Sequence, residues 1–199
     1  MNKRPKYLQD FVDALRDDLS ERVLGDAARA CLTRVFDGLE SSHPLVDRPP
    51  ARLPVLDHLD AALDTARKAN ASLARVADAF AALDPHLAWT RRVQTDRSAS
   101  ENFLDGHANV TIVGPNGLEP RDDVWVGASL LAPHVRYPVH SHAPEEVYFV
   151  LSESQFQHGE GAWFVPGIGG TFYNTPHIKH AMASSDTPLF AIWCLAAAK

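Results

Sequence analysis

Along residues 5–39, apolar side chains recur every three or four positions, which is the period of an amphipathic α-helix. Pro5 suits the first turn of such a helix, and Gly25 followed by Asp26 predicts a stop and a new helix start. The apolar positions are Leu8, Phe11, Val12, Leu15, Leu19, Val23, Cys31, Val35, Phe36 and Leu39. The pattern therefore predicts two helices in this part of the chain.

A proline-rich stretch, SSHPLVDRPPARLP at residues 41–54, fits neither a helix interior nor a central strand, so we interpret it as a connector. The helical period returns at Asp57 and ends before Pro85. Its apolar positions are Leu59, Leu63, Ala66, Leu73, Val76, Phe80 and Leu83. We expect residues 1–88 to form a helical N-terminal segment.

The pattern changes after residue 88, where short runs of β-branched and aromatic residues alternate with turn signals such as GPNG at 114–117. The predicted strands are NVTIV (109–113), DVWVGASLL (123–131), EVYFVL (146–151), GAWFV (161–165) and PLFAIWCL (188–195). Closely spaced strands of this kind are typical of an antiparallel sandwich or barrel. We therefore expect the helical segment to lie against a β-barrel formed by residues 89–199.

Composition narrows the class of protein. Of the 199 residues, 45% are hydrophobic, which is enough for a buried core, and the net charge of −6 argues against a nucleic-acid or anionic-membrane partner. The basic N-terminal start is followed by carboxylates rather than an apolar run, so it does not resemble a secretory signal, and we expect a cytoplasmic protein. Cys31 and Cys194 are expected to be buried and unpaired.

The stretch from His140 to Tyr148, HSHAPEEVY, carries the candidate chemistry. Side chains alternate across a strand, so His140 and His142 should point the same way. After a tight turn, Glu146 and Tyr148 form a second same-side pair, while Glu145 should face the opposite side. Two imidazoles and a carboxylate converging from paired strands are a nitrogen and oxygen donor set for a divalent metal ion such as Fe²⁺, Mn²⁺, Zn²⁺ or Ni²⁺.

HSHAPEEVYFVLS resembles the first cupin motif, in which HxH is followed by three residues and Glu. Downstream, Gly170-TFYNT-Pro176-HIK-His180 resembles the second motif, in which a metal-binding His follows the Pro. This resemblance implies a mainly β cupin fold, a double-stranded β-helix or jelly-roll barrel, here with an N-terminal α-helical segment. His177 competes with His180 as the last ligand because only one of them can point inward, and the spacing from Pro176 favours His180.

As a whole, the chain resembles the cupin-type dimethylsulfoniopropionate (DMSP) lyases of marine bacteria, particularly the short Q-type members. The shared features are the size of the helical segment, HxHxxxExY, and PxxxH before the last strands. The resemblance implies a metal-dependent carbon–sulfur lyase that cleaves DMSP, a small sulfonium carboxylate, to dimethyl sulfide and acrylate. It implies one divalent ion held by His142, Glu146 and His180.

Two tyrosines are candidate catalytic residues. A divalent cation beside Tyr148 would lower the pKa of its phenol, which makes Tyr148 a candidate ligand and general base. The resemblance implies a second pocket tyrosine at Tyr137, although strand parity turns Tyr137 outward unless Pro138 marks a bulge. His140 is either a further ligand or a group that orients water or substrate.

The sulfonium group of such a substrate would be held by cation–π attraction to aromatic faces. The candidates are Trp125, Tyr137, Trp163, Phe172, Tyr173 and Trp193. Because one fold carries many reactions, two alternatives stay open: another cupin enzyme, such as an Fe²⁺ dioxygenase or an isomerase, and a non-catalytic cupin that binds a small ligand. The helical segment is expected to cover the barrel or to support a homodimer.

Overall fold

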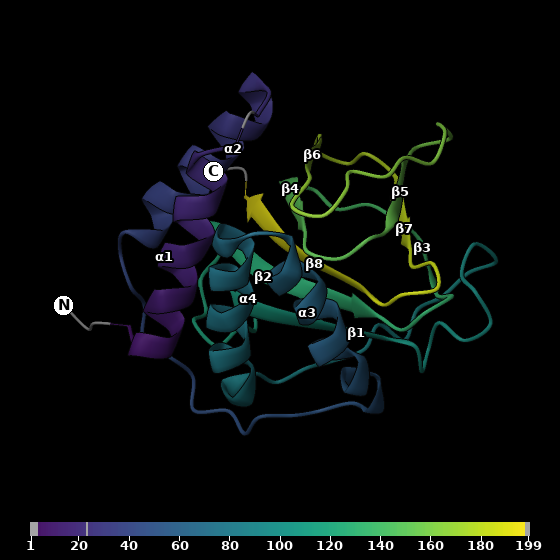
Figure 1. Cartoon of the computed structure of the whole chain (residues 1–199). Coiled ribbons are helices and arrows are strands. Elements are labelled where there is room, and N and C mark those ends of the chain that lie inside the picture. The colour runs from purple at the N-terminus through teal and green to yellow at the C-terminus, as the bar shows by residue number, and fades with distance from the viewer. Residues whose placement is uncertain (1–3, 23, 198–199) are drawn as a thin grey trace.

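A computed structural model describes residues 4–22 and 24–197 of the chain. Residues 1–3 and 23 of the predicted helical segment, and residues 198 and 199 of the predicted barrel, lie outside the described residues. The first part is helical, as the apolar period predicts (Figure 1). Its elements are α1 (Lys6–Ser20), α2 (Asp26–Leu39), the short 3-10 helix η1 (Pro54–His58), α3 (Leu59–Ala69), α4 (Ala71–Leu83) and η2 (Asp84–His86). The proline-rich stretch at 41–54 connects α2 to η1, as expected.

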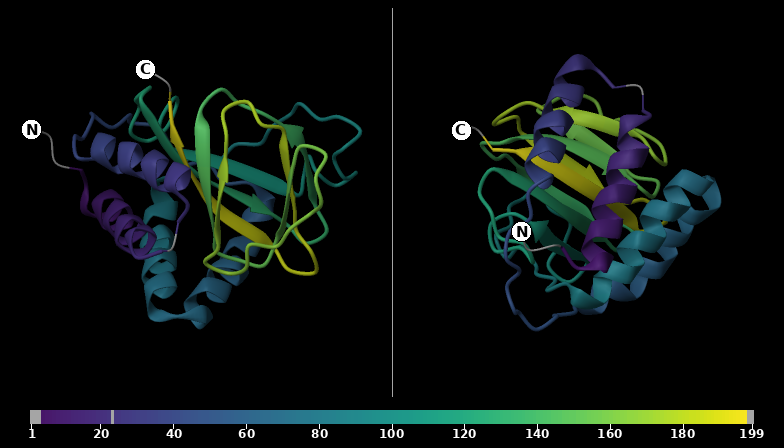
Figure 2. Two further views of the ribbon diagram at one scale, coloured as in Figure 1. Left: turned by 90° about the horizontal axis from the view of Figure 1, so that it is seen from above. Right: turned by 90° about the vertical axis from the view of Figure 1, so that its left-hand side faces the viewer.

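The second helical block is broken at Asn70, which its apolar period does not indicate. Asn70 is extended, and its side-chain oxygen accepts a hydrogen bond of 2.9 Å from the backbone N–H of Leu73. An Asn at this position caps the first turn of α4. The break lets α3 and α4 fold back on each other as an antiparallel pair (Figure 2).

The remaining residues form two antiparallel sheets that face each other (Figures 1 and 2). The five-stranded sheet has the order β1-β2-β8-β4-β6, and the three-stranded sheet has the order β3-β7-β5. The strands are β1 (His107–Val113), β2 (Val124–Leu131), β3 (Arg136–His140), β4 (Glu145–Val150), β5 (Gln155–His158), β6 (Thr171–Asn174), β7 (His180–Ala183) and β8 (Leu189–Ala196). The fold is therefore the predicted barrel with a helical N-terminal segment.

The prediction of a strand for GAWFV at 161–165 is wrong. Of its residues, Phe164 alone pairs, in a single bridge to Phe156, with mutual backbone hydrogen bonds of 2.8 and 2.9 Å. The glycines around it adopt turns, with positive φ at Gly159, Gly167 and Gly169, so the segment is an irregular loop between β5 and β6. An apolar aromatic run is therefore not sufficient for a strand when glycines bracket it.

The two faces of the five-stranded sheet differ in character because side chains alternate along each strand. One face is apolar and packs against the helices, with Phe80 of α4 meeting Phe190 of β8 at a ring-centroid distance of 4.7 Å. The free cysteines Cys31 and Cys194 are both buried in this layer, as expected. The other face looks into the barrel toward the three-stranded sheet.

A buried ion pair ties the chain's first described residue to the barrel. Arg4 Nε donates to Glu119 Oε2 at 2.5 Å, and the Glu119 side chain is fully buried. Arg4 also donates to the backbone carbonyl of Leu39, at the end of α2. In the described part of the chain, no helix has the length and apolar character needed to cross a membrane.

Candidate metal centre

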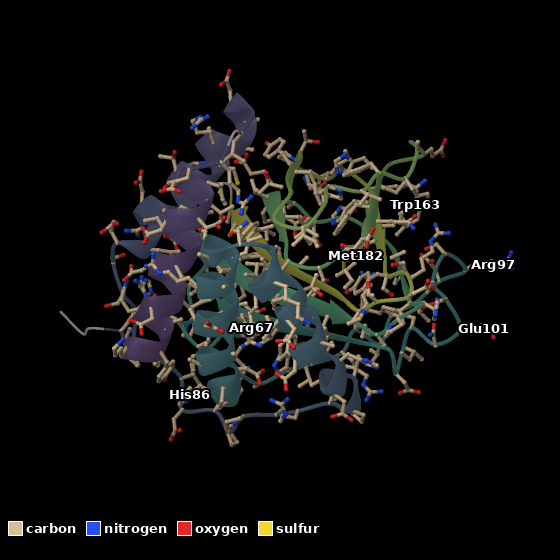
Figure 3. All side chains as sticks on the ribbon, in the orientation of Figure 1. Arg67, His86, Arg97, Glu101, Trp163 and Met182 are labelled. Atoms are coloured by element: carbon tan, nitrogen blue, oxygen red, sulfur yellow. The ribbon has the colours of Figure 1, made fainter. Side chains whose placement is uncertain are left out.

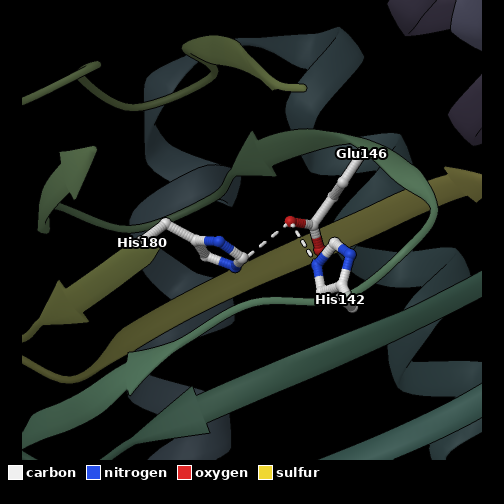
Figure 4. Close-up of side chains that lie close together, drawn as sticks. All are labelled: His142, Glu146 and His180. Atoms are coloured by element: carbon white, nitrogen blue, oxygen red, sulfur yellow. Dashed lines mark hydrogen bonds and ion pairs between the residues drawn. The ribbon is translucent and has the colours of Figure 1, made fainter. Parts of the chain in front are cut away.

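Three side chains meet inside the barrel from separate parts of the chain (Figure 4). His142 follows β3, Glu146 lies on β4, and His180 begins β7. One donor atom from each lies within 4.8 Å of the other two. Glu146 Oε2 lies between the imidazoles, 3.2 Å from His142 Nε2 and 3.5 Å from His180 Nε2.

The backbone hydrogen bonds of the two imidazoles use Nδ1 and turn both Nε2 atoms toward Glu146. His142 Nδ1 lies 2.8 Å from the carbonyl oxygen of Pro144, and His180 Nδ1 lies 3.0 Å from that of Ile178. A carbonyl only accepts, so each Nδ1 carries a hydrogen and each Nε2 faces Glu146. His180 Nε2 presents a lone pair, whereas His142 Nε2 hydrogen-bonds to Glu146 when it carries a proton and becomes a ligand when that proton is lost. This arrangement, with the other ring nitrogen on a backbone carbonyl, is typical of metal-binding histidines.

His180 shows most directly that the group fits a cation. Its Nε2 is buried and, among the described residues, has no hydrogen-bond partner. Burial lowers the pKa of His180, so the ring stays neutral with its lone pair facing a carboxylate. His180 Nε2 and Glu146 Oε2 therefore face each other with no hydrogen between them. A divalent ion would bind both of these atoms together with His142 Nε2. The donor set therefore fits a metal ion, as the sequence motif predicts, without selecting which one.

His142 and Glu146 differ in exposure, which gives the centre an open side. The His142 side chain is 23% exposed, whereas that of Glu146 is 3% exposed. Burial disfavours the charged imidazole of His142, but the hydrogen bond and charge of Glu146 outweigh burial and raise its pKa. A metal ion binding here would therefore compete with a proton on His142.

Asn174 holds the carboxylate of Glu146, a role that its place in the sequence does not indicate. It pairs with Glu146 across β4 and β6, is fully buried, and donates from Nδ2 to Glu146 Oε2 at 2.7 Å. Neighbouring groups of this kind fix the orientation of metal-ligating carboxylates. Asn174 lies inside the second cupin-like motif, but only the register of β4 with β6 shows which residue it faces.

The other two histidine candidates lie outside the group of three. His140 packs on His180, with ring centroids 4.1 Å apart, and its Nδ1 lies 3.0 Å from the carbonyl oxygen of Pro138. Burial and the neighbouring His180 lower the pKa of His140 to about 3, so it is neutral at ordinary pH. His177 is exposed and is not part of the donor group, so His180 is the histidine of this pair that joins the centre.

A cavity of about 260 Å³ opens above the centre. His140, His142, Glu146, Tyr137 and Tyr148 all line it. Tyr148 is buried and stacks on Phe172, with ring centroids 5.0 Å apart. Burial raises the pKa of Tyr148 well above its ordinary value, and the charge of Glu146 adds to this effect. A bound cation would oppose both influences.

Tyr137 faces the cavity because β3 contains a bulge. Tyr137 pairs with Met182 and His140 pairs with His180, so three steps along β3 match two steps along β7. The extra residue reverses the side-chain alternation, which is the bulge that Pro138 was considered to mark. The ring is held edge-on by Phe103 at 5.0 Å and His107 at 5.4 Å.

The structure separates the aromatic candidates for the sulfonium group. Trp125, Tyr137 and Trp193 line the cavity, and Trp163, Phe172 and Tyr173 are not among its lining residues. Tyr173 faces the helices instead, where its hydroxyl donates to Glu145 at 2.7 Å. Trp163 lies beyond the three-stranded sheet, under the guanidinium of Arg136, while Met182 points inward from that sheet (Figure 3).

An antiparallel barrel with a His-Glu-His group inside it defines a cupin. Within that class, the chain belongs to the DMSP lyase (dimethylsulfoniopropionate lyase) family, whose model matches residues 27–191. This confirms the resemblance found in the motifs.

Relatives and solved structures agree with the family. The chain is 27% identical over 157 residues to the putative DMSP lyase DddL of Cereibacter sphaeroides, covering 77% of this chain and 65% of that protein. It is 26% identical over 144 residues to the DMSP lyase DddQ of Ruegeria pomeroyi, covering 72% of this chain and 70% of that protein.

The crystal structure of DddQ from Ruegeria pomeroyi matches 97% of this chain and 92% of its own, with a TM-score of 0.72 at 19% identity, which supports the fold. A structure from the DMSP lyases RdDddP and RnDddQII covers 96% of this chain and 93% of its own, with a TM-score of 0.69 at 25% identity. The chain thus spans these short structures almost completely but about two thirds of the DddL relative.

Proposed function

We propose that this chain is a metal-dependent lyase that cleaves DMSP to dimethyl sulfide and acrylate. The observation that carries the proposal is a His-Glu-His group beneath a cavity lined by two tyrosines, in a chain of the DMSP lyase family. The cavity of about 260 Å³ suits a small molecule, and its wall combines aromatic faces with a few polar groups.

His142, Glu146 and His180 would hold one divalent cation through two imidazole nitrogens and a carboxylate oxygen. When bound, such a cation supplies positive charge that acidifies the hydrogens beside a carboxylate and favours the phenolate of a neighbouring tyrosine. Asn174 would keep the Glu146 carboxylate oriented toward the cation through its 2.7 Å hydrogen bond.

Tyr148 is the proposed general base. It lies on β4 two residues from Glu146, on the same strand face, and lines the cavity. As a phenolate, it removes one proton from the carbon next to the substrate carboxylate. The electron pair left on that carbon forms the double bond of acrylate, and the carbon–sulfur bond breaks toward sulfur. Dimethyl sulfide leaves as a neutral molecule, and the proton stays on Tyr148.

The cationic sulfonium end is assigned to the aromatic part of the wall. Trp125 and Trp193 line the cavity, and a cation over an aromatic face gains about 0.5–2 kcal/mol. No acidic partner is required, which keeps Glu146 available to the metal. His140, neutral and packed on His180, is proposed to orient the substrate or water rather than to complete the ligand set.

The test is headspace detection of dimethyl sulfide from purified protein supplied with DMSP, with and without oxygen. We expect release in both atmospheres, loss after chelation, and recovery when a divalent metal is restored. Absence of dimethyl sulfide from the metal-loaded protein would overturn the proposal. Activity that needs oxygen would instead indicate an oxygenase, the rival cupin enzyme.

A further inference from the structure

A row of polar side chains crosses the inner wall of the barrel and ends at Tyr137. Trp193 on β8 donates from Nε1 to Ser129 Oγ at 3.2 Å, and Ser129 Oγ donates to Asn109 Oδ1 at 2.7 Å. Asn109 Nδ2 then donates to the hydroxyl oxygen of Tyr137 at 3.1 Å. All four residues line the cavity beside the metal centre.

The strand register builds this row. Asn109 and Ser129 are direct partners across β1 and β2, and Trp193 is paired with Gly127, two residues from Ser129 on the same face of β2. A Cβ at Gly127 would lie 2.1 Å from the Trp193 ring, so the indole lies directly over this glycine. The absence of a side chain at position 127 therefore lets the indole nitrogen reach Ser129.

The direction of the hydrogen bonds follows from chemistry. An indole N–H can only donate, so Ser129 Oγ accepts from Trp193 and is left with its own hydrogen to give. Asn109 Oδ1 takes that hydrogen, which turns its amide N–H toward Tyr137. The Tyr137 oxygen is thus occupied as an acceptor, and its own hydrogen remains free to donate into the cavity.

We propose that Asn109 is a positioning residue that, anchored by Ser129 and Trp193, fixes the Tyr137 hydroxyl as a hydrogen-bond donor to the substrate carboxylate. The assignment rests on the proposed lyase function for the identity of the substrate. The two tyrosines then have different roles. Tyr148 accepts the α-proton, whereas Tyr137 keeps its own proton and stabilises the negative charge that develops on the substrate carboxylate as the α-proton leaves.

The Tyr137 environment agrees with a retained proton. The side chain is 6% exposed, and burial raises its pKa above the ordinary value for tyrosine, although the hydrogen bond from Asn109 and the nearby charge of Arg92 act in the opposite direction. Its ring cannot turn away, because Phe103 and His107 contact it and Asn109 fixes its oxygen. A rigid neutral donor aimed at a developing negative charge needs no reorganisation during the reaction.

The test uses Asn109→Asp, which keeps the shape and the bond from Ser129 but can only accept from Tyr137. The Tyr137 hydrogen would then turn away from the substrate, and kcat/KM should fall about 10- to 100-fold, through a higher KM and a lower kcat together. In a Tyr137→Phe background, Asn109→Asp should have little further effect, because the hydroxyl that Asn109 positions is already absent.

Ser129→Ala, which adds no charge, should show the same non-additivity with Tyr137→Phe and a smaller loss of kcat/KM. Thr111→Val on the same face of β1 should simply add to Tyr137→Phe.

Full additivity of Asn109→Asp and Ser129→Ala with Tyr137→Phe would overturn the inference, as would an unchanged rate in Asn109→Asp. Calorimetric binding of acrylate, a carboxylate without the sulfonium, separates this result from failure of the lyase proposal. Acrylate should bind Asn109→Asp and Tyr137→Phe about tenfold more weakly than wild type, even if no dimethyl sulfide is formed. Equal acrylate affinity in all three proteins, or none in wild type, would contradict the role given to Tyr137.

Discussion

The two faces of the five-stranded sheet are made by the same strands but serve different ends. On β4, Val147 and Phe149 face the helices and are fully buried, whereas Glu146 and Tyr148 alternate with them and face the cavity. The outer face is mostly apolar, with Glu145 at the start of β4 bonded to Tyr173 and Arg34, whereas the inner face keeps several polar groups that hydrogen-bond to one another. Stability and chemistry are thus separated by one residue along the strand.

The largest effect is expected on the inner face, from Tyr148→Phe. Loss of the proposed base should reduce dimethyl sulfide release about 10²- to 10⁴-fold, while the His-Glu-His group retains its metal. Metal content by mass spectrometry and turnover are measured on the same sample. Tyr173→Phe is the matched control, because its hydroxyl bonds to Glu145 on the outer face. Near-normal turnover of metal-loaded Tyr148→Phe would remove Tyr148 from the mechanism.

On the outer face, Phe149→Ala should act on folding instead. Phe149 is fully buried beneath the helices, with the guanidinium of Arg22 over its ring at 4.7 Å. Truncating a buried aromatic residue costs about 3–5 kcal/mol, so the urea midpoint should fall markedly. The fraction that remains folded should turn over DMSP at close to the normal rate. A stable but inactive variant would show that the two faces are not separate.

A smaller effect is expected from pH on the free energy of unfolding of the metal-free protein. His140 has a folded-state pKa of about 3, against about 6.5 when unfolded, so acid protonates the unfolded chain first. Stability should therefore fall as pH drops below about 6.5, by roughly 1–2 kcal/mol at pH 5 from this residue. The lowered pKa of His180 acts in the same direction, and the raised pKa of His142 opposes it.

Urea unfolding in chelator at pH 7 and pH 5 measures this dependence. His140→Gln should flatten the difference, because a glutamine cannot take up the proton in either state. An equal pH dependence in wild type and His140→Gln would show that His140 is not held neutral in the folded protein.

Much of this arrangement could be predicted from the sequence because it depends on local spacing. The apolar period indicated the helical segment, and alternation placed Glu146 and Tyr148 on one face and Glu145 on the other. The Pro138 bulge, considered as a way to turn Tyr137 inward, is present in β3. Membership of the DMSP lyase family agrees with the motifs.

The residues missed are those whose role depends on register between distant strands. Asn109 and Ser129 lie in runs whose apolar residues indicated strands. The hydrogen bond between them is visible only once β1 is paired with β2, because the sequence does not give the register of the two strands. Asn174 is similar, since only β6 beside β4 brings it to Glu146. The break at Asn70 and the loop that replaces the strand at 161–165 depend on a cap and on turns that periodicity does not measure.

The central claim is that His142, Glu146 and His180 hold one divalent cation in the barrel. Anomalous diffraction from metal-loaded crystals tests it most directly, with Glu146→Gln and Glu145→Gln as a pair that differ by one position on β4. The account predicts one strong peak about 2.0–2.3 Å from the two Nε2 atoms and the Glu146 carboxylate, present in wild type and Glu145→Gln and weakened or absent in Glu146→Gln. A peak elsewhere, or none between these three side chains in loaded wild-type crystals, would contradict it.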